Sequence, residues 1–273
     1  MYRFDRASAQ AGFRSNEPLS NDQIARYAPS VMATEPHSSR GPRYSIIPTI
    51  NVLDGLRKEG FQPFEVRQTK VRKEDKRDFT KHMVRLRHPD ALGDNAEVPE
   101  IILINSHDGT SSYQLLAGFF RMVCSNGLIS GNVVNDVKVR HTGNIIDNVI
   151  EGSYRVLDNI EAIGERIDTY KSITLERPQQ LAFAKAAVAL RWGDHPPVRE
   201  AEQLIMPRRI EDDTCTLWAT FNRAQENLIK GGLSGRSASG RRTTTRAIGG
   251  VNEDVKLNRA LWTLADQLAK AVQ

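Results

Sequence analysis

The residues of this chain that could do chemistry are mainly cations, and they are densest in residues 231 to 250. This segment, GGLSGRSASGRRTTTRAIGG, holds four arginines and six serine or threonine hydroxyls, and it contains no acidic residue. Guanidinium groups, hydroxyls and glycine-rich backbone amides can together bind phosphate oxygens. We therefore expect Arg236, Arg241, Arg242 and Arg246 to contact phosphates. The alternative is a flexible basic linker between two helices.

A nucleotide-hydrolysing loop explains the same segment poorly. Gly235 and Gly240 have nearly the spacing of a P-loop, but Arg241 and Arg242 stand where that motif needs a lysine and a serine or threonine. The element expected before the segment is a helix, whereas a P-loop follows an apolar strand. The pattern therefore argues against NTP hydrolysis.

A second basic segment spans residues 67 to 87, with nine lysines and arginines against three acids. The formal charge of the whole chain is only +5, so the charge is polarised along the sequence. Such polarisation is typical of proteins with a polyanionic partner. We expect a groove for a nucleic-acid backbone, with Phe79 near it to stack on a base. The cations expected to line the groove are Arg67, Lys70, Arg72, Lys73, Lys81, Arg85 and Arg87. A solvated hairpin that protects a sheet edge with charge is an equal alternative.

Catalytic candidates are few. His107-Asp108-Gly109 is more typical of a turn in which Asp108 bonds the backbone, since no second histidine lies at metal-ligand spacing. Cys124 lies in an apolar stretch, where a buried structural thiol is expected rather than a nucleophile. We expect no catalytic residue, no metal and no cofactor, and therefore a protein that is not an enzyme. A nuclease or phosphotransferase that uses Asp108 is the weaker alternative.

The cysteines and the apolar runs bear on the cellular compartment. Cys124 and Cys215 are far apart and form no disulfide or zinc pattern. The first residues contain no apolar leader, and the longest apolar stretch ends at Arg121. These features predict a cytoplasmic protein without a membrane segment.

The hydrophobic periodicity predicts an α+β fold. Residues 1–18 have no clear period and are expected to form a flexible arm, after which Ser20 caps a short helix. Residues from about 61 to 141 alternate with a period of two and predict about five antiparallel strands. A long amphipathic helix after Gly143 is expected to pack on this sheet, followed by an all-helical C-terminal half. The predicted domains are residues 19–176 and a helical region, 177–273, that carries the basic loop 231–250.

Several motifs resemble one family. These are HDG at 107–109, VCSNGL at 123–128, RHTG at 140–143 and LNRALW at 257–262. In combination they are similar to phage/plasmid-like proteins that carry a domain of unknown function, and the resemblance covers most of the chain from about Leu19 onward. It implies a product of a prophage, plasmid or phage.

The leading hypothesis is an oligomeric protein that binds single-stranded DNA, with duplex DNA as a further partner. The predicted plan of a sheet with a long helix is similar to that of single-strand annealing proteins, which are common on mobile elements, and this suggests strand annealing in recombination. The alternative is a protein that binds a host protein, for example to counter host defence, with its basic loops against an acidic surface.

Overall fold

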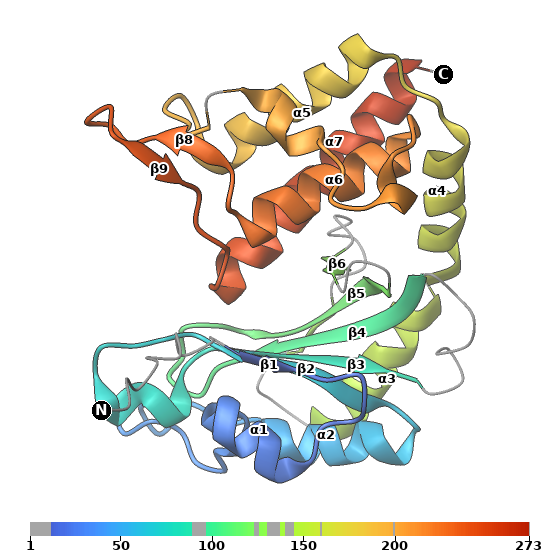
Figure 1. Cartoon of the computed structure of the whole chain (residues 1–273). Coiled ribbons are helices and arrows are strands. Elements are labelled where there is room, and N and C mark those ends of the chain that lie inside the picture. Colours follow the sequence, from blue (N-terminus) through green and yellow to red (C-terminus); the bar gives the residue numbers. More distant parts are fainter. Residues whose placement is uncertain are drawn as a thin grey trace, which may run out of the picture. The chain divides into compact units, whose positions relative to one another are not determined.

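The computed structural model describes residues 12–88, 97–122, 126–129, 137–139, 145–158, 160–198 and 200–272. The chain divides into two compact units. The first is made of the described parts of residues 1–122, 134–159 and 249–251, and the second of those of 123–133, 160–248 and 252–273. Figure 1 shows the elements of both. The units are described separately below.

The first unit is built on a curled antiparallel sheet, as the α+β prediction requires. Its strands run in the order β1-β2-β3-β4-β5, and β7 pairs with β5. The six are β1 (Gly12–Arg14), β2 (Gln62–Gln68), β3 (His82–Arg87), β4 (Glu97–Asn105), β5 (Tyr113–Arg121) and β7 (Val137–Val139). One difference from the prediction is β1, which falls inside the expected flexible arm. It pairs with β2 because Phe13 lies opposite Val66 and stacks on Tyr27, which anchors this stretch.

Helices cover one face of the sheet. They are α1 (Asn21–Tyr27), α2 (Thr49–Lys58) and α3 (Ile145–Asp158). Two 3-10 helices lie in connections: η1 (Pro29–Met32) between α1 and α2, and η2 (Glu74–Phe79) between β2 and β3. Ser20 caps α1 as predicted, since its side chain accepts from the backbone of Gln23 and the Gln23 side chain accepts in return. Alternation along β3 and β4 turns Val84, Leu86 and Leu103 to one face of the sheet. Figure 1 shows α1 and α2 on the same side of the sheet.

The second unit is mainly helical. It contains β6 (Asn126–Ile129), α4 (Ile160–Ser172), α5 (Arg177–Trp192), η5 (Ala201–Ile205), η6 (Ile210–Asp212), α6 (Leu217–Lys230) and nearly all of α7 (Val251–Val272). Helix α4, expected in the first domain, belongs to this unit because it packs against α7: the Tyr170 hydroxyl donates to Asp266 at 2.5 Å, and its ring lies 5.3 Å from that of Trp262. Thr216 caps α6, and Gly231 ends it with a positive φ of 65°.

The prediction of an all-helical C-terminal half was wrong at the basic segment. Residues 234–236 and 242–244 pair as the antiparallel strands β8 (Ser234–Arg236) and β9 (Arg242–Thr244). We call residues 234–244 the arginine hairpin. Glycine, serine and arginine dominate this stretch, and glycine is a poor strand former, so the sequence is more typical of a loop. The strands form because the residues at the base of the hairpin are hydrogen-bonded to each other and to Pro197, as described below.

Candidate nucleic-acid interface

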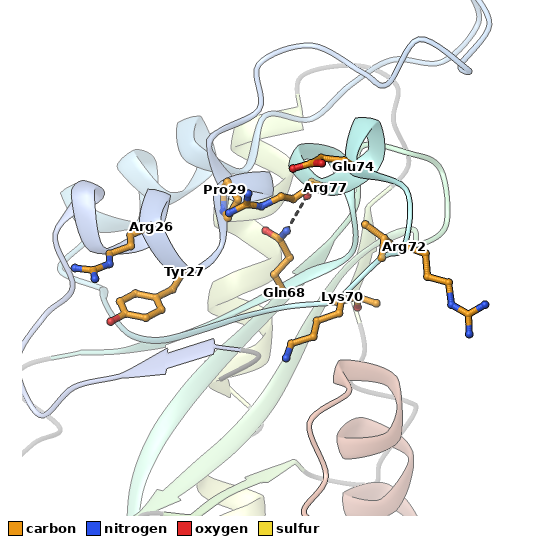
Figure 2. Close-up of a pocket in the computed structure, with 10 residues that line it drawn as sticks. Arg26, Tyr27, Pro29, Gln68, Lys70, Arg72, Glu74 and Arg77 are labelled. Carbon is orange, nitrogen blue, oxygen red and sulfur yellow. Dashed lines mark hydrogen bonds between the residues drawn. The ribbon is translucent and has the colours of Figure 1, made fainter. Parts of the chain in front are cut away.

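The first unit carries a pocket of about 560 Å³ where the end of α1 meets the β2–β3 connection. We call it the basic pocket; its lining residues are Arg26, Tyr27, Pro29, Gln68, Thr69, Lys70, Val71, Arg72, Glu74 and Arg77. Four of these carry a positive charge and one, Glu74, a negative charge. Figure 2 shows Arg26 and Tyr27 on one side of the pocket and Arg72 on the other, with Lys70 between them. The excess of cations makes the pocket attractive to an anion.

Hydrogen bonds hold the wall of the basic pocket in place. The side-chain oxygen of Gln68 accepts from the backbone amide of Ser30 at 2.9 Å and from its hydroxyl at 2.8 Å. The side-chain nitrogen of Gln68 donates to the carbonyl of Arg77 at 2.7 Å, the dashed line of Figure 2. The Thr80 hydroxyl donates to the carbonyl of Thr69 at 3.2 Å. Gln68 thus joins η1 to η2, so the pocket is formed before a ligand binds.

An aromatic pair stands at one side of the basic pocket. The rings of Tyr27 and Phe13 are stacked, with centroids 4.5 Å apart and planes at 8°. The guanidinium of Arg26 lies 5.6 Å from the Tyr27 centroid. The pocket therefore combines cations with an aromatic surface, which are the two chemistries that bind the phosphates and bases of an unpaired strand.

The arginine hairpin of the second unit is the other basic site. Arg236 lies directly opposite Arg242 in the strand register, and the turn between them includes Arg241. The side chains of all three are exposed, as is that of Arg246 just beyond the hairpin. The flanking acid Glu226 is already bound to Arg209 at 2.5 Å and to Lys230 at 2.6 Å. The four arginines expected to contact phosphates are thus brought to one exposed region.

The HDG motif is a turn, as expected. The Asp108 carboxylate accepts from the backbone amide of Thr110 at 3.0 Å and from its hydroxyl at 2.6 Å. Gly109 has a φ of 76°, and a side chain there would collide with Arg40. The backbone of His107 bonds Phe79 and His37, so the motif ties the 33–44 segment to the sheet.

The buried His82 beside this turn is held neutral. Burial and the neighbouring His107 lower the pKa of His82 to about 3. Its ring nitrogens lie 2.9 Å from the Ser30 hydroxyl and 2.8 Å from the Thr49 hydroxyl. Thr49 is therefore a buried hydrogen-bond partner of His82. These bonds assign the histidine a role in holding η1 and α2 against the sheet.

Within the described ranges, no three His, Cys, Asp or Glu side chains are grouped as a metal site would need. Cys215 is an exposed thiol, and Cys124 lies outside the described residues. None of the helices in the described part of the chain is long and apolar enough to cross a membrane.

Comparison with known proteins places the chain in a family. A family model described as "Domain of unknown function (DUF932)" matches residues 36–262. The chain belongs to the DUF932 family. Two relatives from Escherichia coli K12, UPF0380 protein YfjQ and UPF0380 protein YafZ, are each 51% identical over 261 residues, which is 95% of this chain and 95% of each relative. No solved structure matches the chain significantly.

The first unit brings only some of the predicted cations together. Lys70 and Arg72 line the basic pocket, and Lys73 is exposed beside it. Arg67 is half-buried, with its Nε 2.5 Å from a carboxylate oxygen of Glu65. Lys81 is also half-buried; burial lowers its pKa, and the nearby Asp108 carboxylate opposes the shift. Neither Arg67 nor Lys81 lines the pocket.

Arg85 and Arg87 were wrongly assigned to the nucleic-acid groove. Their side chains are 0% and 1% exposed. Arg85 donates to Glu100 at 2.6 Å, and the Nε of Arg87 donates to the other Glu100 oxygen at 2.9 Å. The Arg87 guanidinium also lies 3.6 Å from the centroid of the Phe120 ring. The alternation along β3 was predicted correctly, but the face that carries the arginines is buried.

Arg26, Tyr27 and Arg77 line the pocket but are not among the residues predicted from the sequence. Arg77 lies in the basic segment, residues 67 to 87, but is not among the cations predicted to line the groove. Arg26 and Tyr27 come about forty positions before Lys70 and precede the part matched by the DUF932 model. The link between Ser30 and Gln68, together with contacts of α1 with β2 and of η1 with η2, brings α1 beside the β2–β3 connection. The sequence signal that could have indicated them is Arg26 next to Tyr27 at the end of α1, the helix that Ser20 caps.

Proposed function

We propose that this DUF932 chain binds single-stranded DNA and does not act as an enzyme. The observation that carries the proposal is the basic pocket, which is lined by four cations and by Tyr27. An unpaired strand can place a phosphate and a neighbouring base in one pocket, whereas the bases of a duplex are stacked inside it. The preformed wall lowers the entropic cost of binding.

Electrostatics gives the proposal a quantitative form. Arg26, Lys70, Arg72 and Arg77 can neutralise up to four phosphates. Each contact with a single strand contributes about −0.7 to the slope of log affinity against log salt. The pocket alone therefore predicts a slope of about −2.8.

The wider setting is part of the same proposal. The resemblance to phage/plasmid-like proteins supports a mobile genetic element as the source, and a cytoplasmic protein. We further propose that the chain forms homo-oligomers and promotes annealing of complementary strands, which is suggested by the combination of an antiparallel sheet with α3. Mass measurement with and without an oligonucleotide tests the first part. Pairing of two dye-labelled complementary strands tests the second.

The experiment for the pocket compares two double variants. Lys70→Ala/Arg72→Ala removes two pocket cations, and Arg43→Ala/Lys58→Ala removes two exposed cations of the same unit that do not line it. Fluorescence anisotropy with a labelled 30-nucleotide strand measures affinity. We expect a loss of about a hundredfold or more for the pocket variant, because two charged hydrogen bonds contribute about 3 kcal/mol or more, and a change within about twofold for the control.

Two outcomes would contradict the proposal. Equal losses in both variants would mean that only general charge matters and that the pocket is not a site. No binding by the wild type would instead favour the alternative, in which the same cations contact an acidic surface of a host protein.

A further inference from the structure

The arginine hairpin differs in chemistry from the basic pocket. Residues 231 to 250 include no aromatic residue and no acid. A site for unpaired bases depends on aromatic or similar surfaces on which the bases stack. The hairpin offers guanidinium groups and small hydroxyls, which bind phosphates and the edges of paired bases. Its composition therefore suits a duplex better than a single strand.

The geometry of the hairpin is that of a two-stranded ribbon whose arginine-bearing face is exposed and polar. Alternation places Ser234, Arg236, Arg242 and Thr244 on the same face, and all four are exposed. The other face carries Gly235, which lies against Pro197. Figure 1 shows the ribbon extending from the helices of its own unit. A two-stranded β-ribbon fits the major groove of B-DNA, about 12 Å wide, and is too wide for the minor groove at about 6 Å.

The charge arrangement points to an anionic partner. Arg236 and Arg242 are directly opposite each other, and like charges at such positions destabilise a hairpin. One donor of Arg236 is used within the hairpin, since its Nη1 donates to the Gly240 carbonyl at 2.8 Å. Both arginines are exposed on the same face of the hairpin. A phosphate or a guanine edge between them would relieve the repulsion.

The base of the hairpin is held firmly. The amide of Arg236 donates to the Pro197 carbonyl at 2.8 Å, and that of Gly232 donates to the Thr245 carbonyl at 2.8 Å. Arg191 donates to the Arg246 carbonyl at 2.6 Å. A β-carbon at Gly235 would lie 1.9 Å from the Pro197 oxygen, so only glycine allows this approach. The ribbon is therefore oriented before it meets a partner.

We propose that the arginine hairpin inserts its exposed face into the major groove of double-stranded DNA. The inference rests on the proposed function for nucleic-acid binding and adds to it a duplex site on the second unit. Arg236, Arg241 and Arg242 contact phosphates or guanine edges, and Ser234 and Thr244 supply hydroxyl contacts. The chain then has separate sites for unpaired and paired DNA.

The test uses a labelled 30-base-pair duplex and one of its strands, with binding measured at several salt concentrations. Arg241→Ala/Arg242→Ala removes two arginines that stand at or next to the turn. Lys185→Ala/Lys270→Ala removes two exposed cations from helices of the same unit as a control. We expect the hairpin variant to lose at least about tenfold in duplex affinity and to flatten the salt slope by about 1.8. Its single-strand affinity and the control's duplex affinity should stay within about twofold.

The outcomes separate this inference from the proposed function. If the hairpin variant binds duplex like the wild type, or loses single-strand and duplex affinity equally, the duplex site is overturned while single-strand binding stands. If the wild type binds duplex but no single strand, the pocket proposal fails and the hairpin is supported. Displacement of the wild type by netropsin, a minor-groove ligand, would contradict the choice of groove.

Discussion

Replacing Glu100 with glutamine should strongly destabilise the first unit. Glu100 is fully buried and is bound by Arg85 at 2.6 Å and by Arg87 at 2.9 Å. The variant keeps the shape of the side chain but leaves two buried guanidinium groups against a neutral amide, with the Glu65 carboxylate 3.8 Å from Arg85. Removal of one partner from a buried ion pair costs about 3–5 kcal/mol. With a urea m-value of about 2 kcal/mol/M, the midpoint should fall by about 2 M.

The assay has to report on the correct unit. The three tryptophans, at positions 192, 218 and 262, are all in the second unit, so their fluorescence follows that unit alone. Far-UV circular dichroism includes the sheet and should show the shift. Glu151→Gln is the control, because the Glu151–Arg155 pair is just as short at 2.6 Å but 63% and 67% exposed. Its effect should stay below about 0.5 kcal/mol. A loss below about 1 kcal/mol for Glu100→Gln would refute the burial of Arg85 and Arg87 and return them to the nucleic-acid candidates.

Three further predictions concern pH, the hairpin base and the pocket wall. The folded pKa of His82 is lowered to about 3, so the free energy of unfolding should fall by up to about 1.4 kcal/mol per pH unit below pH 6.5. The pKa of Glu65 is lowered to about 2 by the arginines around it, so Glu65 should add to this loss below about pH 4.5. Urea titrations at stepped pH measure both effects. A flat profile between pH 6.5 and 4.5 would contradict a neutral buried His82. Gly235→Ala should cost about 1–3 kcal/mol of local stability and speed amide exchange in β8, because the methyl group of the alanine would meet the Pro197 carbonyl. Unchanged amide exchange would contradict this close approach. Gln68→Ala should remove about 1–3 kcal/mol and weaken single-strand binding, and an unaffected affinity would show that the link between η1 and η2 does not shape the pocket.

Local signals predicted much of the fold. The capping box at Ser20, the period-two alternation of β2 and β3 and the HDG turn each depend on residues close in sequence. The helix expected after Gly143 appears as α3, which contacts β4, β5 and β7. These elements are specified by side chains within a few positions of one another.

The errors arise where distant segments decide the outcome. Arg85 and Arg87 alternate with Val84 and Leu86 as solvent-facing residues would, and the sequence does not show that Glu100, on the next strand, neutralises them. The arginine hairpin has the composition of a linker, and the sequence does not show that Pro197 approaches Gly235 and supports the strand pairing. Tertiary context overrides local preference in both cases.

The most direct test of the central claim is the salt dependence of wild-type binding to a labelled single strand. The account predicts that log affinity falls with log salt with a slope of about −2.8 or steeper, since four cations line the basic pocket. A slope near zero, or no measurable binding at low salt, would contradict the claim that this chain binds nucleic acid.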